Sequence, residues 1–104
     1  MKNTDTKFKL ADTKDLQALG LDDEALALLM CVATHSTNQV CQGRAKAVLG
    51  TDLTIDQKRS LMSGDGGFMS ACYGGNIELA MRRADNSNTK ALAYLGWALY
   101  LFKS

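Results

Sequence analysis

The sequence contains no proline, a single histidine and only three cysteines, and its charges nearly cancel to a formal net charge of +1. Without proline, no residue breaks a helix by lacking its amide N–H, so long helices are permitted along the whole chain. The small net charge excludes the strongly basic class of dedicated DNA-binding proteins and the strongly acidic class that imitates a nucleic acid. An odd number of cysteines predicts free, buried thiols in a reducing compartment.

The sequence predicts neither a signal peptide nor a membrane-spanning helix. The first residues are polar and lack the apolar stretch of a signal peptide. The longest nearly uncharged apolar run, Ala91 to Phe102, is shorter than the ~20 residues that a membrane span requires. We therefore predict a cytoplasmic protein of a bacterial host cell with no membrane partner.

The chain length of 104 residues fits one domain, so we predict a single helical domain over residues 1–104. Residues 1–11 are polar except for Phe8 and Leu10 and are expected to form a loose N-terminal arm, pinned at most by these two side chains. No segment alternates apolar and polar residues over a sustained length, so strands are not predicted.

Cap residues and glycines predict where helices begin and end. Asp22 and Thr54 are suited to accept hydrogen bonds at helix starts, and Gln57 completes a capping box with Thr54. The first strong helical pattern runs from Asp22 to Leu49, with a break near Ser36. A second pattern, from Phe68 to Arg83, is interrupted by two glycines at 74 and 75 that predict a kink or a close helix contact.

Three weaker start signals are also present. Ser36 with Gln39 has the spacing of another capping box, and Asp65 follows the helix-ending Gly64 and can cap the next helix. Residues 86–88 (Asn-Ser-Asn) read as a turn with ready caps. Together these boundaries predict an all-α protein, a compact bundle of about five helices.

The C-terminal segment from Ala91 to Phe102 carries no charge and is apolar on every side. Such a helix either lies at the centre of a core or is covered by a partner, and we place it at the centre of the bundle. The expected inward face consists of Leu95, Ala98, Leu99 and Phe102. The aromatic residues that do not fit this face are expected either to pack into the core, which we favour, or to serve as interface anchors: Tyr94, Trp97 and Tyr100.

Cys31 and His35 stand four residues apart, which puts them on one side of a helix. A thiol beside an imidazole suits a nucleophile with its base, or two ligands of a metal site. Both sites need further members that the sequence does not supply, since no CxxC pair occurs and there is no second histidine. We therefore predict a packed thiol beside a hydrogen-bonded imidazole, and no enzyme activity, metal or cofactor.

The segment SGDGGF, from Ser63 to Phe68, superficially resembles a calcium loop or a phosphate-binding turn. A calcium loop requires carboxylates at alternate positions and a terminal glutamate, whereas Asp65 stands alone. A phosphate-binding loop requires a lysine after its glycines, and none follows. The segment is better explained as a helix end followed by a helix cap.

Basic residues occur in three short clusters that are candidates for binding phosphates or an acidic protein patch: Arg44 with Lys46, Lys58 with Arg59, and Arg82 with Arg83. Each also has a structural explanation as part of a solvated helix face or as a cation near a helix C-terminus. Convergence of the three clusters in space would make one basic surface, which the sequence alone does not establish.

Two stretches resemble a known class of proteins: VATHSTNQVCQGRAKAVLG (Val32–Gly50) and FMSACYGGNIELAMRRADNSNTKALAYLGWALYLF (Phe68–Phe102). Over residues 22–102 the chain resembles the small helical anti-CRISPR proteins that phages encode against type I systems. The resemblance lies in overall character and not in a shared motif, so no functional residue is carried over. It implies a stoichiometric inhibitor that binds a CRISPR RNA-guided complex or its recruited nuclease.

We therefore expect a non-enzymatic inhibitor or interaction protein that binds and blocks a macromolecular complex, with a type I CRISPR-Cas surveillance complex as the candidate target. The alternative is a small protein that binds single-stranded DNA or RNA with its clustered arginines and lysines. A homodimer is a third arrangement that would cover the C-terminal aromatic residues.

Overall fold

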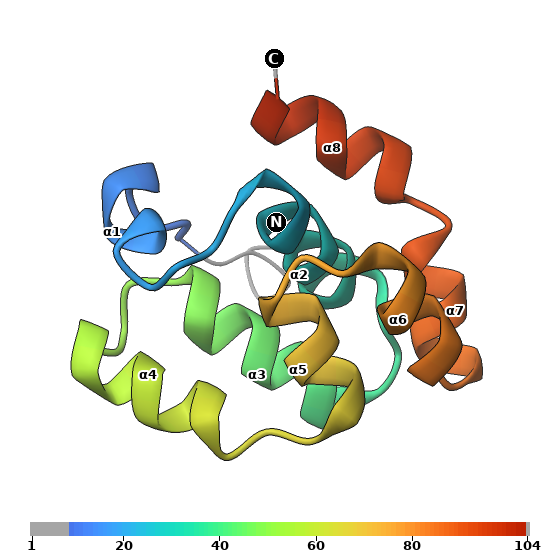
Figure 1. Ribbon diagram of the computed structural model, residues 1–104, viewed down its shortest axis with the longest axis horizontal. Helices are drawn as coiled ribbons and strands as arrows, with labels where there is room; N and C mark the ends of the chain where they lie inside the picture. The colour runs from blue at the N-terminus through green and yellow to red at the C-terminus, as the bar shows by residue number, and fades with distance from the viewer. Residues whose placement is uncertain (1–8, 104) are drawn as a thin grey trace, which may run out of the picture.

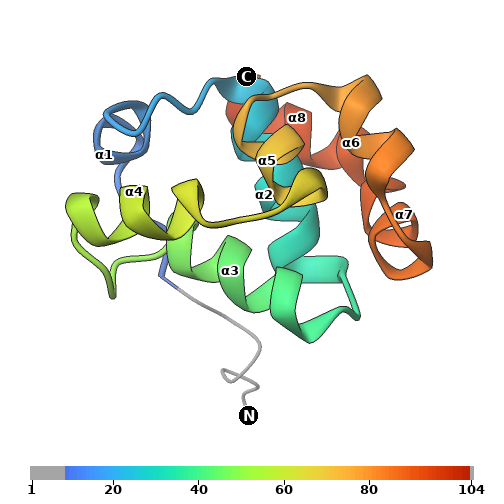
Figure 2. The same cartoon turned by 60° about the horizontal axis from the view of Figure 1, so that its bottom comes forward.

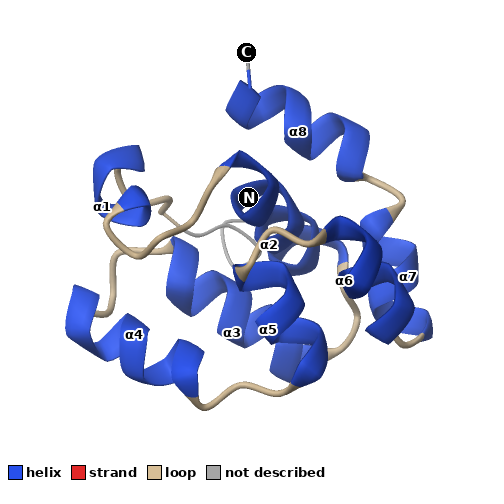
Figure 3. Ribbon diagram, in the orientation of Figure 1, coloured by secondary structure: helices blue, strands red, loops and turns tan. Residues whose placement is uncertain are grey.

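The structure, a computed structural model, describes residues 9–103, and over that range helices joined by loops and turns are its only regular secondary structure (Figures 1 and 3). None of the described helices has the length and apolar character needed to cross a membrane. The all-α prediction is confirmed, but the described residues form more helices than the expected five. They are α1 (Thr13–Gln17), α2 (Asp23–His35), α3 (Gln39–Leu49), α4 (Ile55–Ser63), α5 (Gly67–Tyr73), α6 (Ile77–Arg83), α7 (Asn86–Leu92) and α8 (Leu95–Lys103).

Two predicted helices are each divided into shorter ones. The glycine pair does more than kink the second pattern, because Gly75 adopts a left-handed φ of 70° and separates α5 from α6. The C-terminal segment is divided at Ala93 and Tyr94, whose amides bond the carbonyls of Lys90 and Ala91 three residues back. That tight turn changes the direction of the chain, so α7 and α8 pack separately.

The two strongest cap predictions are confirmed. Asp22 Oδ1 accepts the amide of Ala25 at 2.8 Å, and both halves of the capping box at Thr54 are formed. The predicted box at Ser36 is wrong, because the Ser36 hydroxyl donates instead to Asn88 Oδ1 at 2.7 Å in the interior. Asn38 caps α3 in its place, and the predicted break between α2 and α3 is confirmed.

Two further start signals are corrected. Gly66, not Asp65, is the N-cap of α5, because the Asp65 carboxylate is turned inward to Arg44 and Tyr73. The predicted turn at residues 86–88 is the first turn of α7, since Asp85 accepts the amide of Asn88 at 2.9 Å and starts the helix earlier. In both cases a neighbouring residue, Gly66 or Asp85, is the N-cap of the helix.

Helix α2, not the C-terminal helix, lies at the centre of the fold. Every residue from Ala25 to Ala33 is buried, and α3, α5, α7 and α8 all pack against this helix (Figures 1 and 2). Alanines among its leucines let neighbours approach on all sides. Helix α8 lies on the outside of the molecule against α2, so the prediction that it forms the centre of the bundle is wrong.

The start of the described chain is held at Ala11. This residue is buried, and its amide donates to the carbonyl of Leu49 at 2.8 Å. Leu10, which was expected to pin the N-terminal arm, is 40% exposed, and Phe8 lies outside the described residues. The described part of the predicted arm is therefore attached through Ala11.

The capping box provides a local test of the helix assignments. Thr54→Ala is expected to lower the free energy of unfolding by about 1 kcal/mol, because the amide of Gln57 loses its acceptor. Urea denaturation measures this change. Thr51→Ala is the matched control, since Thr51 is exposed and precedes the helix. Equal stability of the two variants would contradict the assigned cap.

Candidate functional site

The outer side of α8 carries a group of exposed apolar side chains. Its inner side is the one predicted, with Leu95 and Ala98 buried and Leu99 and Phe102 packed against the core. Because these four residues occupy the side facing α2, the remaining large side chains point to solvent. They are Trp97 (43% exposed), Tyr100 (72%) and Leu101 (46%), and together with Tyr94 (48%), which immediately precedes α8, we call them the aromatic face.

Two residues of the aromatic face rest on His35, at the C-terminal end of α2. The rings of His35 and Tyr94 are stacked, with centroids 3.6 Å apart and planes 8° from parallel. Trp97 meets the same imidazole in an edge arrangement, at 5.5 Å and 78°. Such ring contacts contribute about 0.5–1.5 kcal/mol each beyond area burial, so they favour the positions that Tyr94 and Trp97 take on His35.

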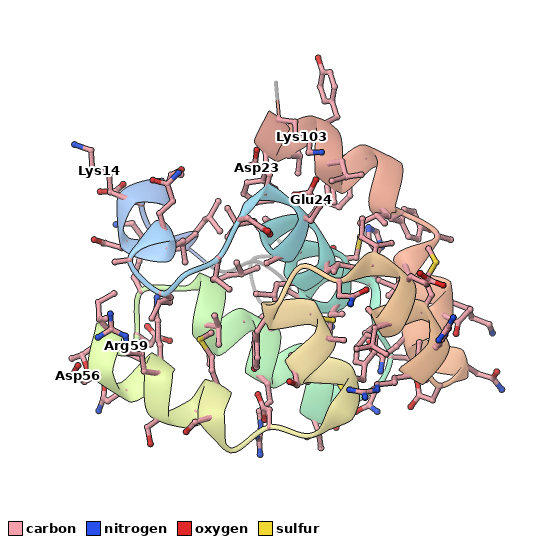
Figure 4. All side chains as sticks on the ribbon, in the orientation of Figure 1. Lys14, Asp23, Glu24, Asp56, Arg59 and Lys103 are labelled. Carbon is pink, nitrogen blue, oxygen red and sulfur yellow. The ribbon has the colours of Figure 1, made fainter. Side chains whose placement is uncertain are left out.

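The far end of α8 is joined to the opposite end of α2. Lys103 Nζ lies 2.5 Å from Glu24 Oε2, and both side chains are labelled in Figure 4. The hydrogen bond from Lys103 lowers the pKa of the Glu24 carboxyl, and the same bond raises the pKa of Lys103. An exposed ion pair adds little stability, so the packing of Leu95 and Ala98, and not this pair, holds α8 against α2.

The basic clusters have interactions within the chain. The Arg44 guanidinium pairs with Asp65, which also accepts the hydroxyl of Tyr73. Lys58 is buried, and its Nζ donates to the carbonyl of Gly50 at 2.5 Å, at the end of α3. Burial lowers the pKa of Lys58. Its ammonium therefore faces the protein interior and not a phosphate in solution.

The exposed arginines also contact their own chain. Arg59 donates to the carbonyl of Ala18 at 3.0 Å and lies 3.8 Å from Asp56 (Figure 4). Arg82 bonds Glu78 at 2.9 Å, one helical turn away. Arg83 bonds the carbonyl of Gly67 at 3.1 Å. Of the six candidate basic residues, the partly exposed Lys46 has no such bond within the described chain.

The three clusters do not form one groove. Lys58 and Arg59 belong to α4, and Arg82 and Arg83 belong to α6, and these two helices lie on opposite sides of the molecule in Figures 1 and 2. Lys46 lies on α3, beside a shallow depression that Lys9 and Asp52 also line. The aromatic candidates, in contrast, are brought together, because Trp97 and Tyr100 lie on the outer side of α8 and Tyr94 immediately precedes that helix.

The Cys31–His35 pair lacks the arrangement of a nucleophile and its base. Cys31 is fully buried, and burial raises the pKa of its thiol to about 12. No hydrogen bond joins the thiol to His35 in the structure, where the imidazole instead contacts the aromatic face. Over residues 9–103, no group of three or more histidine, cysteine, aspartate or glutamate side chains gathers as metal ligands would.

Two residues of the site, Leu101 and His35, were not among the interface residues predicted from the sequence. Leu101 lies one turn from Trp97, and helical spacing from that tryptophan places the two on the same side. His35 lies far from α8 in the sequence, and no local signal connects the two.

Comparison of the chain with protein-family models, with curated protein sequences and with solved structures finds no match.

Proposed function

We propose that this chain is a non-enzymatic interaction protein that binds a macromolecular complex through the aromatic face and thereby blocks it. The observation that carries the proposal is the exposure of Trp97, Tyr100 and Leu101 on the outer side of α8, next to the exposed Tyr94 that precedes the helix. Each aromatic side chain has roughly 150–250 Å² of surface, and about half of it is exposed here, so the three aromatic residues and Leu101 together present on the order of 400 Å², tyrosine hydroxyls included. Patches of this size on small proteins often serve in binding.

The chemistry of the face favours a protein surface as its target. Tyrosine and tryptophan are common anchors of protein interfaces, because they bury a large area with few rotatable bonds and retain a polar group. The face has no charged member, since its residues are Tyr94, Trp97, Tyr100 and Leu101. The resemblance to anti-CRISPR proteins makes a protein subunit of a type I CRISPR-Cas surveillance complex the first target to test.

The nucleic-acid-binding alternative has less support. Contacts with phosphate require basic side chains on one accessible surface, whereas Lys58 is buried and Arg44 is paired with Asp65. Binding of the proposed kind is expected to depend weakly on salt, because apolar burial and not counterion release drives it.

Trp97→Ala is expected to weaken binding to a purified, immobilised type I surveillance complex by about 30-fold, the effect of losing an interface anchor. Met81→Ala is the matched control, because Met81 is 51% exposed and lies on α6, outside the face. Surface plasmon resonance gives both affinities, and circular dichroism checks the fold. Equal affinities for the two variants would contradict the role of the aromatic face, and a wild-type chain that does not bind would remove this target.

A further inference from the structure

We infer that His35 is a pH-sensitive clamp on the aromatic face, in which the protonated imidazolium holds the Tyr94 ring more tightly than the neutral imidazole does. The clamp itself belongs to the isolated chain, and the inference rests on the proposed function only in its consequence for binding. Three features of His35 carry it: its ring contacts, its place at the end of α2 and the charges of the helices around it.

The contact between His35 and Tyr94 suits a cation. The two ring centroids are 3.6 Å apart and the planes are 8° from parallel, so the imidazole lies directly over the face of the tyrosine. Two neutral rings prefer an offset or edge-to-face arrangement, with centroids about 4.5–7 Å apart. A cation over the ring face is instead attracted by the negative charge of that face. A proton gained by His35 therefore turns a stacking contact into a stronger cation–π contact.

The position of His35 in its helix also suits the charged form. His35 is the last residue of α2, where carbonyls without helical partners form the negative end of the helix dipole. The side chain is only partly buried, so the imidazole can exchange a proton with water. Both the helix end and the Tyr94 ring thus interact better with the imidazolium than with the neutral imidazole.

His35 is the group whose charge changes near the face between pH 5 and 8. Histidine is the side chain with its ordinary charge change in this range, and the chain has only one. Among the described residues no carboxylate forms an ion pair with His35. A hydrogen bond from the Asn88 amide lowers the pKa of Asp85, the N-cap of α7, and one from Lys103 lowers the pKa of Glu24. Both carboxylates therefore stay ionised over this range.

The remaining ionisable groups of α2 and of the elements packed against it belong to residue types whose ordinary charge change lies outside pH 5–8. They are Asp22, Asp23, Cys31, Cys41, Arg44, Lys46, Cys72, Tyr73, Lys90, Tyr94, Tyr100 and Lys103. The charge beneath the aromatic face is thus set by one proton on His35.

The clamp has a consequence for binding. A target that covers Tyr94 and Trp97 also covers the partly buried ring on which they rest. The ring contacts are present with and without the target, whereas the contact of His35 with water is lost. Loss of water costs more for an imidazolium than for a neutral imidazole. Binding is therefore expected to be weaker at pH 5 than at pH 8.

A double-mutant cycle of Tyr94→Leu and His35→Phe, measured by urea denaturation at pH 8 and pH 5, tests the clamp in the isolated chain. Tyr94→Leu is expected to lower the folding equilibrium constant about two- to fivefold more at pH 5 than at pH 8, the effect of one exposed cation–π contact. The extra stability is thus present in acid and lost as the pH rises. Phenylalanine at position 35 keeps a ring but takes up no proton, so in that chain the effect of Tyr94→Leu is expected to be the same at both pH values.

Equal effects of Tyr94→Leu at the two pH values in the wild-type background would overturn the inference. Tyr100→Leu is the matched control, because Tyr100 is 72% exposed and has no ring contact with His35 among the described residues. A pH dependence as large at Tyr100 as at Tyr94 would overturn the inference as well. Circular dichroism checks each fold, and His35→Gln, which is also neutral, replaces His35→Phe if that chain does not fold.

Affinities for the immobilised surveillance complex at the two pH values separate this inference from the proposed function. Between pH 8 and pH 5 the wild-type chain is expected to lose at least about fivefold more affinity than the His35→Phe chain, the lower end of the cost of burying a polar group. The comparison cancels any effect of pH on the complex itself. Equal losses in the two chains overturn the pH dependence of binding and leave the proposed function intact. A wild-type chain that binds at neither pH overturns that target, and the double-mutant cycle still decides the clamp.

Discussion

Leu29→Ala is expected to lower the free energy of unfolding by about 2–5 kcal/mol, the range for removing a fully buried leucine. Leu29 is completely buried in α2, the helix that α3, α5, α7 and α8 surround. The truncation leaves a cavity that rigid neighbours on several sides do not close. Urea denaturation, followed by circular dichroism, measures the change.

The matched control is Leu101→Ala, which makes the same truncation on the outer side of α8. Leu101 is 46% exposed, so the expected change in stability is within about 0.5 kcal/mol. A comparable loss in both variants would mean that α8 is as enclosed as α2, and would contradict the assignment of its outer side as a free surface.

Asp65→Ala is expected to lower the free energy of unfolding by about 2–3 kcal/mol. The Asp65 side chain is 3% exposed and joins Arg44 of α3 to Tyr73 of α5. Its removal leaves the hydroxyl of Tyr73 without its acceptor and Arg44 without its counter-ion. Charged hydrogen bonds contribute about 1.5–3 kcal/mol each, and the partial exposure of Arg44 reduces the loss because its guanidinium can turn to water.

A double-mutant cycle with Arg44→Ala isolates the contact. The two variants are expected to be non-additive by about 1 kcal/mol or more, since either substitution removes the same ion pair. Asp52→Ala, at an exposed position in the α3–α4 loop, is the control and is expected to be nearly neutral. Additive effects at Arg44 and Asp65 would show that the pair contributes nothing to the fold.

Features determined by neighbouring residues were predictable from the sequence. The caps at Asp22 and Thr54 need only a side chain and an amide three residues away, so their spacing was sufficient. The inward side of α8 followed from helical periodicity for the same reason. The exposure of Tyr94, Trp97 and Tyr100 was not the favoured prediction, which placed them in the core.

Features determined by tertiary contacts were not predictable. Asp65 has the sequence of a helix cap, but Arg44 and Tyr73 draw its carboxylate inward, and nothing near it in the chain indicates either partner. His35 supports Tyr94 and Trp97 across a long separation in sequence. Apolar content made α8 the expected centre, because composition does not distinguish a covered side from an uncovered one.

The tertiary contacts of the basic clusters were not predictable from the sequence either. Sequence spacing suggested solvated or phosphate-binding cations, whereas Lys58 Nζ bonds the end of α3 and Arg59 bonds the carbonyl of Ala18. A backbone carbonyl that accepts from a distant side chain leaves no pattern in the sequence. The structure therefore favours the aromatic face, and not the basic residues, as the candidate binding site.

The central claim is that the aromatic face is open in the isolated chain and covered when it binds. Trp97 is the only tryptophan of the chain and belongs to this face, so acrylamide quenching of its fluorescence reports directly on the coverage. In the isolated chain Trp97 is expected to be readily quenched, and with saturating surveillance complex it is expected to be protected. Strong protection in the isolated chain, or unchanged quenching with saturating surveillance complex, would contradict the claim.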